Sequence, residues 1–368
     1  MDITLLQENL LQVLTRVSRI TPSRPQLPVL QNIVLKATKD GLEITATNME
    51  TSEIVWTGGK VGKEGELCVS ARVLLEFVAS LPPESVRLQT KEEQLLISCN
   101  GYQAELPSLS SREFPPVPSL TEKGNGDIDK DKLCGALSSV LFAAASDEGR
   151  PILTGVKVIE DEGETTFVAT DGYRLSLQRL ELPIKNLSHA VLPARALSEV
   201  VKLSGEMKEE KMMRVGIAGE HQVGFSIGET TLLTRTLDGE YPNFERIIPK
   251  TFTTRALIEK EGFLRAVRSA AIFARDNANI VKLELENQKI RVSANAAQVG
   301  KNSIELPIKI DGDGGEIAFN SRFLLDFLTN FQGEEFLFEM TGALNAGAFK
   351  STKDNSFLHI IMPVRVTS

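Results

Sequence analysis

One short string in the sequence has the spacing of a catalytic motif. Residues 224–228 read Gly-Phe-Ser-Ile-Gly, and in many hydrolases a G-x-S-x-G string exposes a nucleophilic serine on a strained turn between a strand and a helix. Ser226 would then attack an ester or amide carbonyl. The flanking residues instead form short β-type runs separated by glycines, so we expect a strand, a turn and a second strand here. A hydrolase that uses Ser226 remains an alternative hypothesis.

Other residues suited to catalysis or metal binding are scattered along the chain. Neither histidines nor cysteines occur at a metal-ligand spacing, and each histidine is expected to be an ordinary surface or partly buried side chain. The glycine-rich segments 123–127 and 311–316 are predicted to be turns rather than dinucleotide or calcium loops. We therefore expect no catalytic residues, no metal site and no cofactor, and a protein that is not an enzyme. The histidines are His189, His221 and His359, and the cysteines are Cys68, Cys99 and Cys134.

The charge balance argues against a conventional nucleic-acid-binding surface. The 368 residues include 41 Lys and Arg against 49 Asp and Glu, a formal net charge of −8, whereas proteins that bind phosphates directly are usually basic. Net charge does not describe how charge is distributed, so this exclusion is provisional. The N-terminal residues lack the pattern of a signal peptide, and no apolar run of about 18 residues occurs. A cytoplasmic protein is expected.

A helix start recurs three times along the chain. In each copy a small or polar residue and an arginine precede an amphipathic pattern, which predicts a short helix after a short β-type run. The copies are SARVLLEF at 70–77, PARALSEV at 193–200 and NSRFLLDF at 320–327. The arginine therefore repeats at steps of 123 and 127 residues, at Arg72, Arg195 and Arg322.

A strand that ends in a turn recurs with the same period. Its alanines are separated by 123 and 125 residues, at Ala46, Ala169 and Ala294. A third of 368 is roughly 123, so two independent motifs return the period expected of three repeats. The Phe-Pro pair at 114–115 and the Tyr-Pro pair at 241–242 also lie 127 residues apart, near the ends of two copies. We therefore predict three domains, at 1–120, 121–249 and 250–368.

Each repeat has the pattern of an α+β domain. It opens with a helical stretch, whose apolar residues in the first copy follow the i, i+3, i+4, i+7 rule, at Leu10, Val13, Leu14 and Val17. The second helix carries the repeated arginine, and most other residues alternate with period two between glycines and asparagines. The predicted fold is therefore two helices packed on antiparallel sheets of about eight short strands in each domain.

Four strings resemble one known family. They are Arg24-Pro-x-Leu-Pro-Val-Leu30, Ala169-Thr-Asp-Gly-Tyr-Arg-Leu175, Leu237-Asp-Gly-Glu-Tyr-Pro242 and Met362-Pro-Val-Arg365. Together with the threefold period they make the whole chain similar to the bacterial DNA polymerase III beta subunit, the sliding clamp. The resemblance implies three tandem repeats of the DNA-clamp fold. It further implies a head-to-tail homodimer that forms a six-domain ring, with helices lining the hole and sheets outside.

The resemblance also implies a function and a set of partners. Such a ring encircles double-stranded DNA without reading its sequence, and it confers processivity by tethering the replicative polymerase. The clamp loader and other proteins that carry a clamp-binding motif would be further partners, and no membrane is involved. Because a ring need not neutralise many phosphates to stay on DNA, the acidic net charge is compatible with this function. A repeat scaffold that binds only proteins is the remaining alternative.

The resemblance places a partner-peptide cleft between the second and third domains. A mostly apolar wall with a polar rim suits an extended peptide, and Arg174 and Arg365 would hold a peptide carboxylate or carbonyl. For Leu153, Ile247 and Ile360 the alternative is ordinary core packing. The matching positions are Leu153, Thr170, Gly172, Tyr173, Arg174, Leu175, Pro242, Arg246, Ile247, Leu344, Ile360, Met362, Pro363, Val364 and Arg365.

Three positions depart from the family pattern. Tyr173 replaces a usual histidine, Val364 a usual methionine and Ala346 a usual serine. The peptide preference is therefore expected to differ in detail from that of the family.

Further positions match DNA-facing and dimer contacts of the family. Arg16 and Arg19 share a face of the first helix and would add to the positive charge of the inner helices. Each assignment has an alternative. A single arginine could simply face solvent, and the recurring arginine could make a structural contact between the helices of each domain. The dimer positions could instead pack within their own domains. The DNA-facing positions are Arg24, Arg72, Arg150, Arg195, Lys202, Arg265, Arg268 and Arg322. The dimer positions are Ala104 and Leu106 facing Ile272 and Phe273.

Overall fold

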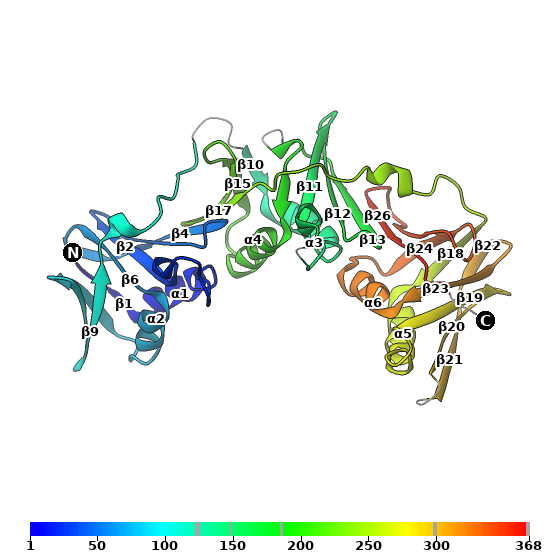
Figure 1. The fold of residues 1–368 in the computed structure, drawn as a ribbon, viewed down its shortest axis with the longest axis horizontal. Helices are drawn as coiled ribbons and strands as arrows, with labels where there is room; N and C mark the ends of the chain where they lie inside the picture. The colour runs from blue at the N-terminus through cyan, green and yellow to red at the C-terminus, as the bar shows by residue number, and fades with distance from the viewer. Residues whose placement is uncertain (122–125, 148, 185–186, 297–299, 366–368) are drawn as a thin grey trace. The chain divides into compact units, whose positions relative to one another are not determined.

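The chain folds into two compact units built from antiparallel strands and short helices. A computed structural model describes residues 1–121, 126–147, 149–184, 187–296 and 300–365 (Figure 1). The first unit contains residues 1–130 and 203–236, and the second contains residues 131–202 and 237–368. The middle repeat is thus divided between them, because its strands continue the sheet of the first repeat in one unit and that of the third in the other.

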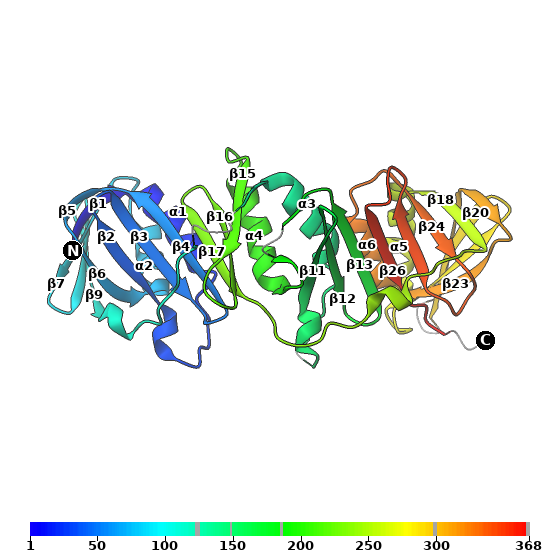
Figure 2. The ribbon, with the colours of Figure 1, turned by 90° about the horizontal axis from the view of Figure 1, so that it is seen from above.

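Within the described residues, the first unit is organised by one sheet of thirteen strands, in the order β10-β15-β16-β17-β4-β3-β2-β6-β9-β8-β7-β1-β5. Helices α1 (Gln7–Val17) and α2 (Ala71–Ala79) pack against each other and against this sheet (Figure 2). The strands are β1 (Asp2–Leu6), β2 (Asn32–Thr38), β3 (Gly41–Thr47), β4 (Thr51–Gly58), β5 (Lys60–Lys63), β6 (Gly65–Ser70), β7 (Ser85–Lys91), β8 (Gln94–Cys99), β9 (Tyr102–Leu109), β10 (Gly126–Asp129), β15 (Met212–Ile217), β16 (Gln222–Ile227) and β17 (Thr230–Arg235).

The second unit contains a nine-stranded sheet, β14-β11-β12-β13-β26-β25-β24-β18-β22, and a four-stranded sheet, β21-β20-β19-β23, within the described residues. Helices α5 (Lys260–Ala274) and α6 (Ser321–Asn330) pack together between these sheets, and α3 (Lys130–Leu141) and α4 (Ala194–Glu206) belong mostly to this unit. The strands are β11 (Gly155–Asp161), β12 (Glu164–Thr170), β13 (Arg174–Leu180), β14 (Val191–Pro193), β18 (Thr254–Glu259), β19 (Ile280–Glu286), β20 (Lys289–Ala296), β21 (Gly300–Pro307), β22 (Lys309–Gly312), β23 (Gly315–Asn320), β24 (Glu335–Met340), β25 (Gly347–Ser351) and β26 (Phe357–Ile361).

The predicted α+β repeats are confirmed, and every strand pair is antiparallel in the described part of the chain. The recurring arginine string begins α2, α4 and α6. The Ser70 hydroxyl accepts a hydrogen bond from the Val73 amide, and the Asn320 side chain accepts one from the Arg322 amide at 2.9 Å. These caps satisfy amide groups that have no partner inside the helix, which explains why both helices begin where the string begins.

A second repeated contact joins the two helices of each repeat. The first residue of the leading helix donates to a carbonyl at the end of the second: Gln7 Nε2 to Val78 at 2.8 Å, and Lys260 Nζ to Phe331 at 2.7 Å. In the middle repeat, buried Lys130 donates to the carbonyls of Ser204 and Met207. A donor at this position satisfies carbonyls at the C-terminal end of the second helix, which have no partner within the helix. A lysine there also interacts favourably with the helix dipole.

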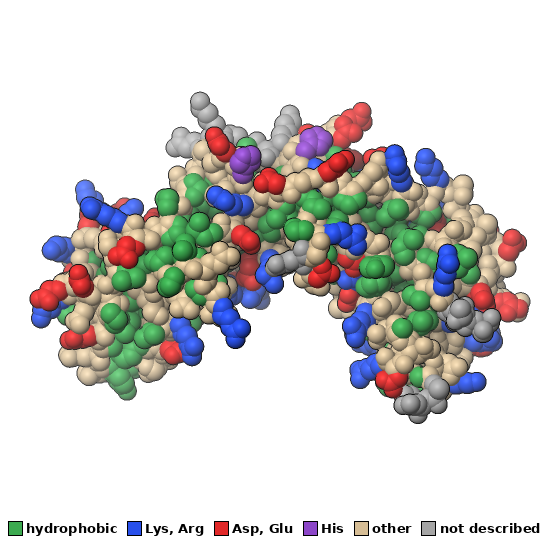
Figure 3. Space-filling view, viewed as in Figure 1, with side chains coloured by type: hydrophobic (Ala, Val, Ile, Leu, Met, Phe, Trp, Pro, Cys, Tyr) green, Lys and Arg blue, Asp and Glu red, His purple; other side chains and the backbone are tan. Residues whose placement is uncertain are grey.

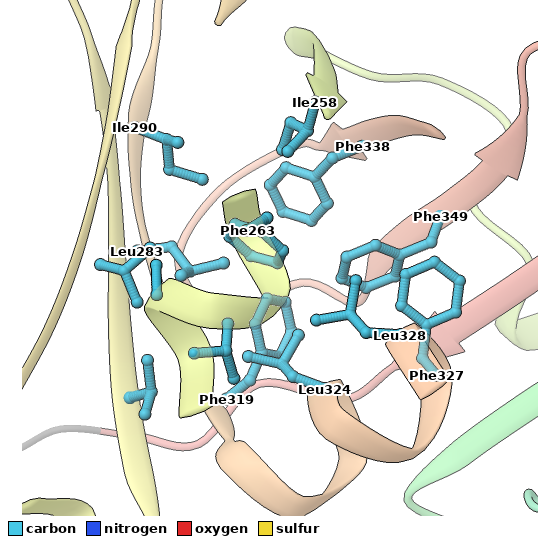
Figure 4. Close-up of a cluster of buried hydrophobic side chains, with 14 of the residues drawn as sticks. Ile258, Phe263, Leu283, Ile290, Phe319, Leu324, Phe327, Leu328, Phe338 and Phe349 are labelled. Atoms are coloured by element: carbon cyan, nitrogen blue, oxygen red, sulfur yellow. The ribbon is translucent and has the colours of Figure 1, made fainter. Parts of the chain in front are cut away.

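The core of the third repeat is rich in phenylalanine (Figure 4). Phe327 on α6 lies 4.8 Å from Phe349 and 5.3 Å from Phe336, measured between ring centroids. Phe263 on α5 contacts Phe336 edge to face at 5.7 Å. Tilted and edge-on aromatic pairs add about 0.5–1.5 kcal/mol each beyond the area they bury. This cluster fixes α5 and α6 against β24 and β25.

Candidate functional sites

The turn between β12 and β13 is held by its own side chains. The Thr170 hydroxyl donates to the Arg174 carbonyl at 2.6 Å, and Asp171 Oδ1 accepts from the amides of Tyr173 and Arg174. Gly172 has a φ of 92°, a left-handed conformation that costs glycine little. The first repeat makes the same bonds from Thr47 and Asn48. These bonds supply the physical reason for the Thr-Asp-Gly string.

Arg174 is already engaged by two carboxylates. Its Nη1 donates to Asp326 on α6 at 2.6 Å, and its Nε donates to Asp171 at 3.0 Å. The guanidinium carbon lies 4.6 Å from the ring centroid of Phe323 and 5.9 Å from that of Phe142, and the side chain is 10% exposed. The expectation that Arg174 holds a peptide carboxylate therefore needs revision, because this residue ties the turn to α6.

Arg150 lies at the same turn. A Cβ atom on Gly172 would be 3.3 Å from Arg150 Nη1, so the glycine makes room for the guanidinium. Arg150 is exposed and forms no ion pair with any described residue. Arg150 was expected in the DNA-facing set, whereas the structure places it beside the predicted cleft residue Gly172. A free guanidinium here can bind a carboxylate or a carbonyl, the role expected of Arg174.

Beneath the turn, three cleft positions are core residues. Leu175 on β13 pairs in register with Ile360 on β26, and both belong to a buried cluster with Val168 and Leu177. Leu153 is also buried. The alternative of core packing thus holds for Leu153 and Ile360. It does not hold for Ile247, which is 42% exposed in the 3-10 helix η5 (Phe244–Ile247).

The second unit exposes several large apolar side chains at the predicted cleft positions. Tyr173 is 62% exposed, Leu344 63% and Met362 39%. The chain end is held beside them, because the Met362 amide donates to the Tyr173 carbonyl and the Val364 amide to the Ala318 carbonyl, both at 2.8 Å. Groups of exposed large apolar side chains are typical of a protein-binding surface. Of the other predicted positions, Pro242, Arg246 and Arg365 are exposed, Pro363 and Val364 are half-buried, and Thr170 is buried.

A fully buried histidine lies under the same region. His359 on β26 stacks parallel to Phe327 at 5.2 Å and contacts Phe142 at 5.1 Å, and neither ring nitrogen has a hydrogen-bond partner. Burial and the nearby Arg174 charge lower the pKa of His359 to about 3. The expectation of a surface or partly buried side chain was therefore wrong for His359, which is a neutral core residue.

Most of the predicted DNA-facing cations carry uncompensated charge. All eight are exposed, and six of them form no ion pair with any described residue: Arg24, Arg150, Arg195, Arg265, Arg268 and Arg322. Arg72 pairs only with Glu76 on its own helix at 2.8 Å, so no structural contact between helices explains the recurring arginine. Lys202 lies 3.9 Å from Glu199. Lys and Arg side chains project from the helical side of each unit, with acidic ones among them (Figure 3).

Arg16 and Arg19 differ from this pattern. Both bind Glu206, Arg16 at 3.2 Å and Arg19 at 2.5 Å, and Arg16 is buried. These hydrogen bonds, that of Arg19 foremost, lower the pKa of Glu206. Glu206 therefore compensates one of the two positive charges, and the pair adds less positive charge than expected.

The alternative catalytic site is absent at Ser226. Strands β16 and β17 are joined by a turn at Gly228, whose φ is 49°, and no helix follows the serine. The Ser226 hydroxyl accepts a hydrogen bond from Thr231 at 3.1 Å. The predicted strand, turn and strand are confirmed, and so is the turn near residue 314 between β22 and β23. Segment 123–127 lies mostly outside the described residues.

Among the described residues, no three His, Cys, Asp or Glu side chains gather in an arrangement that would bind a metal ion. None of the described helices combines the length and apolar character that crossing a bilayer requires.

Comparison with known proteins covers the whole chain. Models of the N-terminal, central and C-terminal domains of the DNA polymerase III beta subunit match residues 1–118, 127–243 and 245–365. The chain belongs to this family. The beta sliding clamp of Bacillus subtilis is 28% identical, with 99% of this chain and 100% of the relative covered, and that of Streptomyces coelicolor is 29% identical with both fully covered.

Solved clamp structures share the fold. The crystal structure of the Bacillus subtilis sliding clamp has a TM-score of 0.94 at 27% identity, and all of both chains is covered. A Pseudomonas aeruginosa clamp bound to griselimycin has a TM-score of 0.92 at 25% identity, with the same coverage. The three repeats are therefore three tandem clamp domains, and the family is one of non-catalytic processivity factors.

The predicted dimer positions lie on strand β9 and on helix α5. Half-buried Ala104 and Leu106 are on β9, which pairs along its length with β8 and at only two residues with β6. Ile272 is 56% exposed on α5, and Phe273 packs partly into the core of the third domain. Helix α5 packs against β21, an edge strand of the described four-stranded sheet.

Proposed function

We propose that the protein is a replicative sliding clamp, a ring-shaped homodimer that encircles duplex DNA in the cytoplasm. It tethers the replicative polymerase, the clamp loader and other partners, and it performs no catalysis. The observation that carries this proposal is the match of all three domains to the DNA polymerase III beta family. Domain boundaries at 1–120, 121–249 and 250–368 form part of the proposal.

The distribution of charge supports weak, sequence-independent contacts with DNA. Six exposed arginines lack an ion-pair partner among the described residues, and most lie on or beside helices. On the sheet, half-buried Lys282 and exposed Lys289 and Arg291 are paired with glutamates. Unpaired cations attract phosphates without reading bases, and a few such contacts leave the ring free to move along DNA.

Strand pairing supports closure of the ring by a second copy. At the join between the first two domains, β17 pairs with β4, and at the next join β26 pairs with β13. Among the described residues, the strand at the corresponding place in the first domain is β9, which pairs beyond β8 only at two residues with β6, and the one in the third domain is the edge strand β21. Pairing of β9 with β21 of a second chain, made twice, would close a ring of six domains through two equivalent contacts. Ala104, Leu106, Ile272 and Phe273 would lie in these contacts.

The experiment that tests the ring combines mass with DNA topology. Light scattering should give twice the mass of the 40.3 kDa chain, and the loaded protein should stay on circular DNA and leave when the DNA is cut. Equal release from circular and linear DNA would refute topological binding. A monomer at high concentration would favour the protein-only scaffold, and ester hydrolysis lost in Ser226→Ala would favour the hydrolase.

We also propose that partner peptides bind over the cluster of Leu175 and Ile360, with Arg150 as the free cation at the rim. Support comes from the exposed side chains of Tyr173, Leu344 and Met362 in the same unit, and from the hydrogen bond of the Met362 amide to the Tyr173 carbonyl. A Met362→Ala, Pro363→Ala variant should bind partner peptides at least tenfold more weakly while its melting temperature is unchanged. Unchanged affinity would remove these residues from the site. Val73→Ala, which removes an exposed apolar side chain from α2, is the matched control.

A further inference from the structure

A groove lies on the first unit, between the sheet and the segment that follows β9. It has a volume of about 240 Å³ and opens to solvent. Its apolar wall comes from strands β2 and β4 and from the segment itself, at Val34, Ile54, Phe114, Pro115, Pro116 and Val117.

The same place in the second repeat is filled by aromatic rings. Ile54 pairs across strands with Thr45, and the equivalent residues 123 positions later, Leu177 and Val168, also form a cross-strand pair. There the following segment packs Tyr241 and Phe244 onto this pair, and the Tyr241 hydroxyl donates to the Val168 carbonyl at 3.2 Å. The aromatic residues come from the segment that begins the 3-10 helix η5.

The sequence explains why the first repeat leaves the space open. At the step of 127 residues, Phe114 and Pro115 correspond to Tyr241 and Pro242, whereas Val117 corresponds to Phe244. A valine at 117 cannot fill the volume of the phenyl ring. Phe244 thus covers this site in the second repeat, whereas Val117 leaves it open in the first repeat. Binding of an apolar group to a groove lined by apolar side chains is favourable, because it removes apolar surface from water.

We propose that this groove binds an aromatic side chain presented by an extended segment of a partner protein. The segment would place one aromatic residue as Phe244 is placed in the second repeat, because Phe114 already occupies the position that corresponds to Tyr241. This site is separate from the cleft of the second unit and goes beyond the function proposed above. It gives the clamp a second docking surface for extended segments, on its first domain.

The rim of the groove carries balanced charge. Lys36 lies 3.9 Å from Glu43, and Glu66 accepts a hydrogen bond from the Ser111 hydroxyl at 2.6 Å. With Arg112 also in the lining, two cations face two carboxylates. Binding is therefore driven by apolar contact and should depend little on salt, unlike the binding of DNA.

The probe is a fluorescein-labelled peptide with the sequence of residues 241–248, YPNFERII. Fluorescence polarisation with the full chain should give saturable binding, and the peptide with both aromatic residues changed to alanine should bind at least tenfold more weakly. Val117→Phe should fill the groove with the ring found in the second repeat, weaken binding at least tenfold, and leave the melting temperature unchanged or higher. Val73→Phe, which adds the same ring at an exposed site on α2, should bind normally.

Two results would overturn the proposal. One is a failure of the binding assay: either the wild type and Val117→Phe bind the peptide with equal affinity, or binding of the peptide does not saturate at millimolar chain concentration. The other is loss of binding in the Met362→Ala variant, because the peptide would then occupy the cleft of the second unit. Failure of the ring test on circular DNA leaves these readouts unaffected, so the two proposals can fail separately.

Discussion

Arg174 should be the most important polar side chain for the stability of the second unit. Its bond to Asp326 joins a carboxylate that is 47% exposed and contributes about 1 kcal/mol, whereas the bond to the largely buried Asp171 contributes about 1.5–3 kcal/mol. Contact with the Phe323 ring adds about 0.5–1 kcal/mol. In Arg174→Ala, Asp171 keeps its two amide donors and Asp326 gains water, so neither carboxylate is stranded. We expect a net loss of about 3 kcal/mol.

The single tryptophan provides a selective assay. Trp56 lies in the first unit, so its fluorescence reports that unit, while far-ultraviolet circular dichroism reports the whole chain. In urea, Arg174→Ala should lower the midpoint of the circular dichroism transition and leave the Trp56 transition in place. Arg214→Ala, which removes an exposed ion pair with Asp127 in the first unit, is the control and should cost less than about 0.5 kcal/mol. Equal small effects of both variants would refute the argument.

Three further outcomes are expected. Burial depresses the pKa of His359 from 6.5 to about 3, so between these pH values the unfolded chain binds a proton that the folded chain does not. The free energy of unfolding should therefore fall as pH drops from 6.5 towards 3. In His359→Phe, the free energy of unfolding measured in urea should depend less on pH over this range. Gly172→Ala should cost about 1 kcal/mol and weaken peptide binding, because φ is 92° and the new Cβ meets Arg150, and an unchanged peptide affinity would contradict this. Lys260→Met should cost about 1–2 kcal/mol in thermal unfolding through the lost bond to the Phe331 carbonyl, whereas exposed Lys353→Met should cost nothing measurable.

Local pattern was enough to predict the repeated elements. The arginine string predicted α2, α4 and α6 because a cap and an amphipathic face are properties of neighbouring residues. The alternating runs predicted antiparallel strands for the same reason. Ser226 could be rejected as a nucleophile from its flanks, since glycine-separated β-type runs already indicated a hairpin.

Contacts between distant residues could not be predicted in this way. The partner of Arg174 lies 152 residues away on α6, and that of Arg16 lies 190 residues away. Whether an arginine is paired depends on such contacts and not on its own neighbours, so the pairing of Arg174 with Asp326 could not be predicted. The helix-ending donors Gln7, Lys130 and Lys260 did leave a signal, because a long polar side chain begins the leading helix of every repeat.

The incompletely paired strand β9 and the edge strand β21 have a consequence for polymerisation. Under the proposed pairing, β9 of each chain pairs with β21 of another chain. Head-to-tail contacts of this kind extend into open fibres when two chains do not close into a ring. Pro107 and Pro307 lie near the ends of these strands, and proline cannot donate a ladder hydrogen bond. They therefore limit the length of any mismatched pairing, as edge prolines do in sheets that must avoid aggregation. Replacing either proline would favour fibres over the closed dimer.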